Sequence, residues 1–295
     1  MLVPYAAGGV TDSLARSLAR RLTERWSVPV LVDNKPGAGT SIGTAAAARA
    51  SADGSVLLVT SFGFVGNPLM LPNLPYSPAS FAPLALIGES TGVLFVHPSV
   101  PASDVPTFVA WLRQRAASGA APATFASSGN GSSVHVMAEL FSSAIGVPII
   151  HVPYRGNAPG MADLIGGQVQ AMFDSTAALT HARAGRIRAL AVSTSRPSQL
   201  APGLPTIGQS GVDGLSGFDA GSWFGVFAPA AATRSLQARL ADDIQGALTS
   251  PGMADEIMKT GVEPRAMSAA EFGAYIQRQI DTWGPVIRAR NIRPD

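Results

Sequence analysis

Apolar positions alternate along this chain between a helical and an extended spacing. After the extended pair Val3 and Pro4, apolar residues recur every three to four positions from Leu14 to Leu22, which predicts a helix with one buried face. Short β-rich runs and further amphipathic stretches then follow one another to the end of the chain. Strands that alternate with helices are typical of parallel α/β sheets, in which ligands bind at the carboxyl ends of the strands. We therefore expect an α/β protein whose site residues lie in loops after strands.

The same pattern gives approximate bounds for the other elements. Strands are expected at residues 28–32, 55–60, 81–87, 92–97, 123–126, 148–152, 169–173, 188–193 and 222–229. Helices are expected at residues 42–50, 108–117, 134–146, 236–248 and 269–288.

Proline-rich stretches divide this order into two predicted domains. Residues 98–106 are rich in proline and mark a crossover into a second domain. The apolar runs 93–98 and 222–229 both end at a proline, and we interpret them as the two crossing strands. The first domain would comprise residues 1–97 and 225–295, including both C-terminal helices, and the second residues 98–224. A chain of 295 residues is long enough for two domains of ordinary size.

Composition excludes several classes of protein. A hydrophobic content of 46% with only 14% charged residues excludes a disordered chain. The net charge is +2 and no run of Lys or Arg offers a polyanion a surface, so we expect no nucleic-acid partner. The chain has no cysteine and therefore no disulfide or thiolate metal site, and we expect neither a metal nor a cofactor. No apolar run reaches the roughly 18 residues of a membrane span.

The first candidate site is the loop between the extended residues Val3 and Pro4 and the first helix. Gly8 and Gly9 permit positive φ and leave the backbone open to a ligand, while Thr11 or Asp12 can cap the helix. Unpaired N–H groups and the helix dipole would then favour a carboxylate or a phosphate, although Asp12 argues against a highly charged ligand. A purely structural glycine turn remains the alternative. The candidate ligand contacts in this stretch are Tyr5, Ala7, Gly8, Gly9, Thr11 and Asp12.

A second loop repeats this logic. The strand at 123–126 is followed by a glycine-rich turn, and Ser132 or Ser133 can cap a helix that stops at Gly146. His135 could contact the ligand or pack under the turn. The candidate contacts here are Ser127, Gly131, Ser132 and His135.

Four further candidate residues follow three other strands. Ser61 lies after the strand at 55–60, and Asp174 after the strand at 169–173, where it could accept hydrogen bonds or cap a helix. Tyr154 and Arg155 lie after the strand at 148–152. Arg155 could form a bidentate pair with a carboxylate or brace its loop at the surface.

Two catalytic or nucleotide motifs are rejected. Gly37, Gly39 and Gly43 nearly form a dinucleotide fingerprint, but the third glycine falls one residue late and no acidic residue follows at the usual distance. Ser90 lies in a G-x-S-x-G match, yet a strand follows it where the hydrolase elbow requires a helix.

Five collinear motifs resemble the receptors of the tripartite tricarboxylate transporters, also called Bug receptors, of the bacterial periplasm. These motifs are VPYAAGGVTD, NKPGAGTSIG, SSGNGSSVH, HVPYRGNAP and DLIGGQVQAMFD. The resemblance implies a type II periplasmic-binding-protein fold, in which two α/β lobes with a central ligand cleft are joined by two crossing hinge strands. It implies a protein without catalytic residues that closes on a small organic acid and passes it to a two-component membrane permease. We expect a monomer.

The resemblance also implies roles for individual residues. The first loop and the serine-glycine loop would hold one carboxylate, partly through water, with Asp174 and the Tyr154-Arg155 turn as weaker contacts. Ala7 replaces the proline that usually precedes the glycine pair. Because only Met1 and Leu2 precede Val3, we expect a secretory leader and a few strand residues to be missing from this numbering.

The ligand class is predicted from the residues expected at the far end of the cleft. Phe62, Phe64 and Trp223 are aromatic, and we count no additional cation among them. We therefore expect a monocarboxylate, aromatic ones included, or a dicarboxylate whose second acid is reached by Ser, Thr or water. Citrate fits less well.

Alternative functions come from two other classes. A Ser/His hydrolase would use Ser132 or Ser90 with His135, but the sequence offers no third residue to orient the imidazole. A ligand sensor that feeds a signalling partner would use the same binding residues. An effector domain of a transcription regulator would need a DNA-binding segment upstream, for which this sequence has no room.

Overall fold

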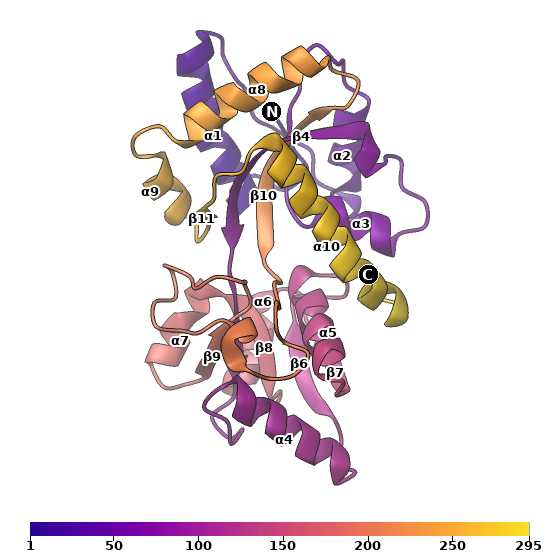
Figure 1. Cartoon of the computed structure of the whole chain (residues 1–295), viewed down its shortest axis with the longest axis vertical. Coiled ribbons are helices and arrows are strands. Elements are labelled where there is room, and N and C mark those ends of the chain that lie inside the picture. Colours follow the sequence, from indigo (N-terminus) through magenta and orange to yellow (C-terminus); the bar gives the residue numbers. More distant parts are fainter. Residues whose placement is uncertain (295) are drawn as a thin grey trace. The chain divides into compact units, whose positions relative to one another are not determined.

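The computed structural model describes residues 1–294, which form two compact units with a sheet each (Figure 1). Unit 1 comprises residues 1–89 and 223–284, and unit 2 comprises residues 90–222 and the residues from Pro285 onward. The expected α/β class and the expected two-part organisation are confirmed.

Unit 1 is built on a six-stranded mixed sheet with the order β11-β4-β10-β3-β1-β2. Strand β1 pairs in parallel with both β2 and β3, whereas β10 runs antiparallel to β3 and β11 antiparallel to β4. The strands are β1 (Leu2–Val3), β2 (Asp33–Asn34), β3 (Leu58–Thr60), β4 (Phe81–Ser90), β10 (Ser222–Pro229) and β11 (Glu263–Pro264). The chain leaves unit 1 after β4 and returns to it at β10.

Helices cover both faces of the unit 1 sheet because its strands carry apolar side chains on both sides. Val3 and Val59 belong to a core with α1, α8 and α9, while Leu2 and Leu58 belong to a second core with α2, α3 and α10. The predicted apolar face of α1 is buried along its whole length. The helices are α1 (Val10–Trp26), α2 (Ser41–Ala48), α3 (Gly63–Met70), α8 (Arg234–Leu248), α9 (Met253–Met258) and α10 (Ala269–Ala289), with short 3₁₀ turns η1 (Ala38–Thr40) and η2 (Pro78–Ser80).

Unit 2 is built on a five-stranded sheet with the order β7-β6-β8-β5-β9. Strand β6 pairs in parallel with β7 and β8, and β5 runs antiparallel to β8 and β9. The strands are β5 (Gly92–Val96), β6 (Ala123–Ser127), β7 (Ile149–Pro153), β8 (Ala171–Ser175) and β9 (Arg188–Val192).

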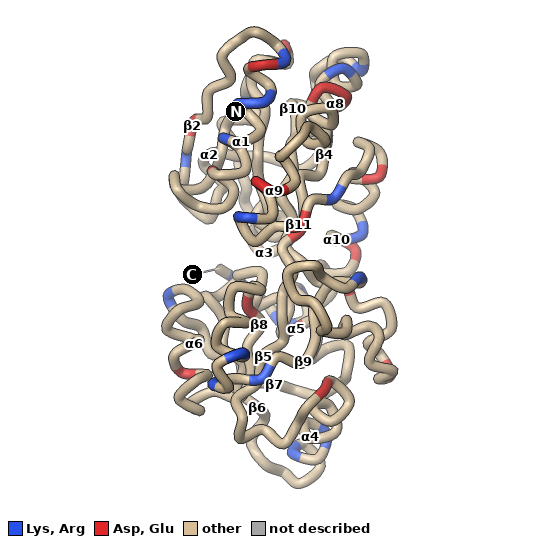
Figure 2. The backbone as a smooth tube through the Cα atoms, turned by 90° about the vertical axis from the view of Figure 1, so that its left-hand side faces the viewer, with Lys and Arg blue, Asp and Glu red and all other residues tan. Residues whose placement is uncertain are grey.

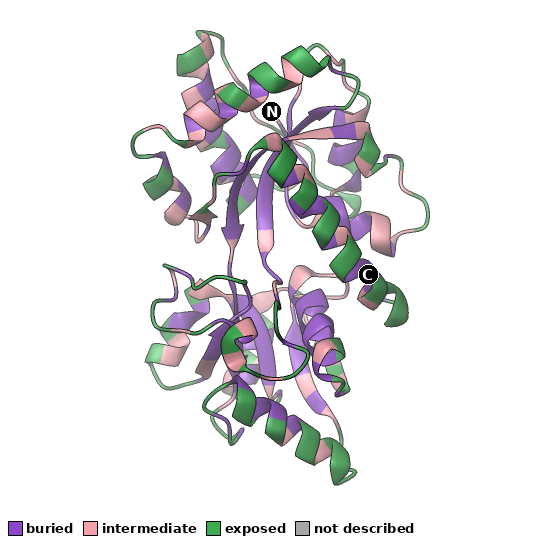
Figure 3. Cartoon of the chain, viewed as in Figure 1, coloured by how far each residue is buried: buried purple, intermediate pink, exposed green. Residues whose placement is uncertain are grey.

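Helices of unit 2 also cover both faces of their sheet. Phe125 and Phe173 pack with Phe108 of α4 and Phe141 of α5 on one face, and Met161 of α6 belongs to the core on the other. In Figure 3 the strands are mostly buried and the outer helix surfaces exposed. The helices are α4 (Val105–Ala117), α5 (Ser133–Ile145), α6 (Asn157–Ile165) and α7 (Leu179–Arg183), with 3₁₀ turns η3 (Thr176–Ala178) and η4 (Ile207–Ser210).

The unit boundaries differ from the predicted domain boundaries at two places. Strand β5, which the prediction assigned to the first domain as a crossing strand, lies between β8 and β9 in the sheet of unit 2. The end of the chain, also assigned to the first domain, belongs to unit 2, where Arg290 pairs with Glu139 at 3.1 Å and Ile292 is buried. Hydropathy marks both segments as buried without indicating which sheet buries them.

The strand predicted at residues 28–32 is wrong. Only Asp33 and Asn34 pair with β1, and Val28 and Leu31 have exposed fractions of 58% and 76%. A β-rich run forms a strand only where a neighbouring edge is available along its length, and β1 offers only two residues.

Replacing Gly225 by Ala should destabilise unit 1, because an added Cβ would lie 2.2 Å from the ring of Phe272. Overpacking of this kind costs about 1–3 kcal/mol of unfolding free energy, measurable by urea titration. Gly208→Ala is the matched control, since the nearest atoms to its added Cβ lie at ordinary contact distance, 3.5 Å. Equal stability of the two variants would contradict the packing described for β10.

Candidate functional site

Three loops of unit 1 follow the parallel strands β1, β2 and β3 and therefore leave the same edge of the sheet. Residues 4–9 follow β1, residues 35–40 follow β2, and Ser61 follows β3. The side chain of Asn34 donates to the carbonyl of Tyr5 at 3.2 Å and so ties the first loop to the end of β2. The edge holds every candidate residue that the sequence predicts for unit 1.

The first loop has the glycine conformation that was predicted, but the helix cap differs. Gly8 has φ +84°, whereas Gly9 is extended with φ −80° and is the N-cap of α1 without a side-chain cap. Thr11 and Asp12, which were predicted as caps, lie inside the first helical turn. Both are buried, so the exposed part of the loop is the stretch from Ala6 to Gly9.

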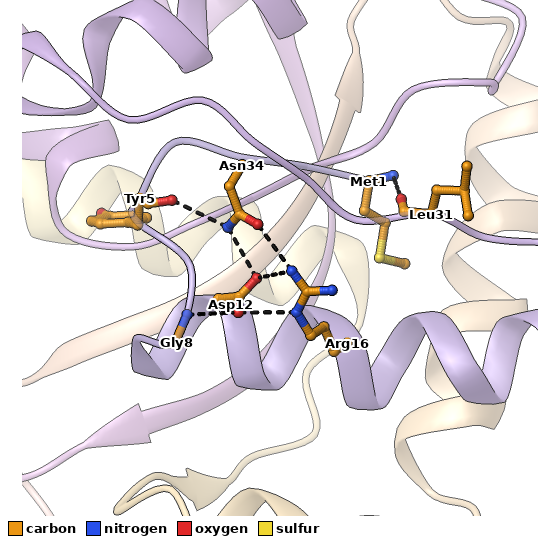
Figure 4. Close-up of polar contacts among 7 residues, drawn as sticks. All are labelled: Met1, Tyr5, Gly8, Asp12, Arg16, Leu31 and Asn34. Atoms are coloured by element: carbon orange, nitrogen blue, oxygen red, sulfur yellow. Dashed lines mark hydrogen bonds and ion pairs between the residues drawn. The ribbon is translucent and has the colours of Figure 1, made fainter.

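Asp12 binds three parts of unit 1 through a single buried carboxylate (Figure 4). Its Oδ2 accepts hydrogen bonds from the amide of Gly8 at 2.9 Å and from Nε of Arg16 at 3.0 Å. Its Oδ1 accepts from Nδ2 of Asn34 at 2.9 Å and lies 3.0 Å from the Arg16 guanidinium. The hydrogen bond and charge of Arg16, helped by Gly8 and Asn34, lower the pKa of Asp12 to about 2.

This network changes the chemistry expected of Asp12. Its oxygens are occupied by four protein donors, and Arg16 balances its charge, so it holds the loop in place. The first-turn amides of Val10 and Thr11 have no carbonyl partner four residues earlier within the helix. The backbone beside Gly9 is therefore the part of this loop that can donate to an anion.

Tyr5 and Ser61 lie on the same edge. The Tyr5 hydroxyl lies beside Thr60 and the backbone of Gly63 and Ser61, and its burial raises the pKa of Tyr5. Ser61 is buried at the end of β3, with an exposed fraction of 6%.

In unit 2 the loops after β6, β7 and β8 leave a common edge, because these three strands are parallel. The amide of Tyr154 donates to the carbonyl of Ser127 at 3.0 Å, and that of Gly156 to the carbonyl of Ser128 at 3.3 Å. Asn157 donates to Asp174 at 2.5 Å. These contacts bring together the three predicted groups of unit 2.

The predicted helix start and stop of the serine-glycine loop are confirmed. Ser132 is the N-cap of α5 and accepts from the amide of His135 at 3.3 Å, and Gly146 ends the helix with φ +68°. Gly129 and Gly131 both have positive φ, at +129° and +70°.

His135 supports this loop from below. Its Nδ1 accepts a hydrogen bond from the amide of Gly131 at 3.1 Å, and its ring stacks on His151 at 3.5 Å between centroids, 6° from parallel. Burial, followed by the neighbouring His151, lowers the pKa of His135 to about 4. The imidazole is therefore neutral near pH 7.

The side chains do not form a hydrolase site from the predicted residues. Ser132 Oγ donates to the carbonyl of Gly129 at 2.7 Å, and His135 Nδ1 is occupied by Gly131. Ser127 Oγ does lie 2.5 Å from Nε2 of His151, but Ser127 has no exposed surface and no substrate can reach it. Ser90 ends strand β4 and no helix follows it.

The remaining predicted residues of unit 2 have different surroundings. The Tyr154 hydroxyl donates to Asp163 at 2.6 Å, and burial together with that carboxylate raises the pKa of Tyr154 to about 12. Arg155 is exposed and forms no ion pair among the described residues. Asp174 is buried, which raises its pKa, although Ser175 and Asn157 donate to it.

Two of the three aromatic residues expected beside the ligand belong to the core instead. Trp223 and Phe64 have exposed fractions of 0% and 2% and pack against Phe227. Phe62 is half-buried and contacts Trp283, with 5.0 Å between ring centroids and 41° between ring planes. The sequence placed Trp223 and Phe64 near loops, but it did not show that their rings lie in the core beside the sheet.

Three residues that the sequence analysis missed hold the loops in place: Asn34, His151 and Asn157. Asn34 lies in the motif NKPGAGTSIG, and His151 and Asn157 lie in HVPYRGNAP. The sequence therefore held a signal at these positions, but their hydrogen-bond partners could be identified only from the fold.

Other features of the described residues lie away from these loops. A surface pocket of about 650 Å³ lies between α1 and α8, lined by Trp26, Leu236 and Leu240. Charged residues of both signs are scattered over both units (Figure 2). In residues 1–294 there is no cluster of His, Cys, Asp and Glu suited to a metal ion, and no helix has the length and apolar character needed to cross a membrane.

Comparison with known proteins points to one family. The family model described as tripartite tricarboxylate transporter family receptor matches residues 14–292. Protein BugT of Bordetella pertussis is 34% identical over 293 residues, which cover 98% of this chain and 87% of BugT.

Two solved structures resemble the whole chain. Rpa4515 of R. palustris with adipate is 32% identical, has a TM-score of 0.76 and covers 100% of this chain and 97% of its own. MatC of Rhodopseudomonas palustris with bound malate is 26% identical, has a TM-score of 0.72 and covers 97% of each chain.

Replacing Asp12 by Ala should lower the unfolding free energy by about 1–3 kcal/mol at pH 7, because Gly8 and Asn34 lose their acceptor. The pKa of Asp12 is about 2 in the folded chain and 3.8 for a free side chain, so its contribution is present above pH 3.8. It is lost as the pH falls through 2, and the two proteins should converge there in urea titrations.

Asp213→Ala is the control for that comparison, because Asp213 is exposed and accepts no hydrogen bond among the described residues. It should leave the stability almost unchanged at every pH. A constant difference between wild type and Asp12→Ala down to pH 2 would contradict the role given to the carboxylate.

Proposed function

This chain belongs to the tripartite tricarboxylate transporter receptor family, and from that premise we propose that it binds a small organic acid and delivers it to a membrane permease. Receptors of this family bind solutes and are not enzymes, and the chain has the α/β fold of its solved relatives. We assign it no catalytic residue.

One observation supports carboxylate binding above the others: each unit presents a fixed glycine loop at the start of a long helix. In unit 1 the backbone beside Gly9 is exposed and precedes α1, and in unit 2 the Gly129–Gly131 turn precedes α5. Amides at helix N-termini donate well to carboxylates. In our proposal each of these loops is a carboxylate-binding element of its own unit.

The proposed ligand is a dicarboxylate. Relatives at 32% and 26% identity were solved with adipate and with malate, both of which carry two carboxylates. An aromatic acid has less support, because two of the three aromatic residues expected beside the ligand, Phe64 and Trp223, are buried in the core. Arg155 is an exposed cation on the loop bonded to Ser127 and Ser128, so it is our candidate for the second carboxylate.

The transport partner and the location complete the proposal. By analogy with the family, the partner is a two-component membrane permease of the tripartite tricarboxylate type, and the protein acts in the periplasm as a monomer. A sensor that reports to a signalling partner would use the same binding loops.

Titration calorimetry with adipate, malate, benzoate and citrate tests the proposed ligand class. We expect saturable binding of at least one dicarboxylate, with weaker or no binding of benzoate and citrate. At a concentration 100 times its Kd, the ligand should stabilise the protein by about 2.7 kcal/mol. Tight binding of citrate without binding of a dicarboxylate would contradict the proposed ligand class. No binding of any of the four acids would contradict the proposed function.

Replacing Gly9 by Val should abolish binding without unfolding the protein. The φ of Gly9 suits any residue and its added Cβ meets nothing closer than Ala6 O at 3.6 Å, so the fold can accept a side chain. A branched side chain would, however, cover the first-turn amides. Gly9→Ala provides the graded control and should weaken binding less. Unchanged affinity in Gly9→Val, measured by calorimetry, would exclude this loop from the site.

A further inference from the structure

We propose that His151 is a positioning residue that, together with His135, holds the serine-glycine loop in the conformation that binds the ligand. The link to ligand binding rests on the proposed function, whereas the ordering of the loop can be measured without a ligand. His151 lies on β7, outside the loop that it acts on.

Ser127 connects His151 to the glycine turn through its hydroxyl. Its hydroxyl lies 3.1 Å from the carbonyl of Gly129, which can only accept, and 3.2 Å from the amide of Gly129, which can only donate. His151 Nε2 lies 2.5 Å from the same oxygen, so Ser127 Oγ and the His151 ring form a hydrogen bond in which either atom can supply the proton.

His135 binds the other end of the same turn. The amide of Gly131 donates to its Nδ1, so that nitrogen carries no proton. Each imidazole thus serves one end of the same turn: His151 acts on Gly129 through Ser127, and His135 acts on Gly131 directly.

The rings of His135 and His151 stack on each other. With centroids 3.5 Å apart and planes 6° from parallel, neither ring can turn without the other losing contact. His135 is buried on α5, and strand β7 holds His151 in register with Phe125 of β6. The pair therefore adds the rigidity of a helix and a strand to the turn's own bonds between Ser132 and the Gly129 carbonyl.

The turn needs this support because glycines give it no side chains to pack. Gly129 and Gly131 lose more conformational entropy on ordering than other residues, and a loop that must order on binding loses affinity. A preformed loop avoids that cost. His151 is therefore expected to affect ligand affinity without contacting the ligand.

The test uses the whole protein and two substitutions that separate ring shape from hydrogen bonding. His151→Phe keeps an aromatic ring for the stack and loses the hydrogen bond to Ser127, whereas His151→Gln loses the ring and keeps an amide that can hydrogen bond near the position of Nε2. In the ligand-free protein, amide hydrogen exchange at Gly129 should quicken by roughly tenfold in His151→Phe and by less in His151→Gln, which loses only the stack. Affinity for whichever acid the wild type binds should follow the same order.

Ile150→Ala controls for a general weakening of the edge strand, because Ile150 is 42% exposed on the same strand. It should leave exchange at Gly129 unchanged. Wild-type exchange in His151→Phe, or equal acceleration in Phe and Gln variants, would overturn the positioning role. If the wild type binds no acid, the proposed function fails, while the exchange data still decide the role of His151.

Discussion

The carboxylate of Asp12 is the interaction on which the candidate site of unit 1 depends. Backbone amides that donate to a ligand are not available for secondary-structure hydrogen bonds, so side chains have to fix the conformation of such a loop. Asp12 does this by accepting from Gly8 within the loop, from Arg16 on its own helix and from Asn34 at the end of β2. Asp12 thereby connects the loop after β1 to helix α1 and to the end of β2, so the loop is fixed to the edge of the sheet.

In unit 2 the corresponding loop is fixed by hydroxyl and imidazole groups instead of a carboxylate. Its turn contains two glycines with positive φ and is held by hydroxyl and imidazole groups, with Ser127 buried beneath it and His135 behind it. The loop after β7 is then bonded to the turn through Tyr154 and Gly156. In both units, side chains buried beneath or behind the loop fix the backbone that remains available at the surface.

Sequence reasoning succeeded where the deciding interaction is local. The Gly8 turn, the Ser132 cap and the Gly146 stop each depend on residues within four positions, and all three are confirmed. It failed where partners lie far apart in the chain. Asp12 was predicted as a possible cap and a ligand contact, because the sequence does not show that Asn34, which is 22 residues away, binds it. Trp223 was assigned to the ligand because hydropathy does not say which side of a strand faces the core.

The electrostatics of these loops limit how a carboxylate can be recognised by them. Asp12 is balanced by Arg16, His135 is neutral near pH 7 because its pKa is lowered to about 4, and burial raises the pKa of Asp174. The glycine loops themselves therefore offer hydrogen bonds without a strong net charge. Recognition by such donors depends on their geometry more than on long-range attraction, since neutral donors gain little beyond hydrogen-bond distance. The order of the loops, set by buried side chains, is consequently what determines how well they bind.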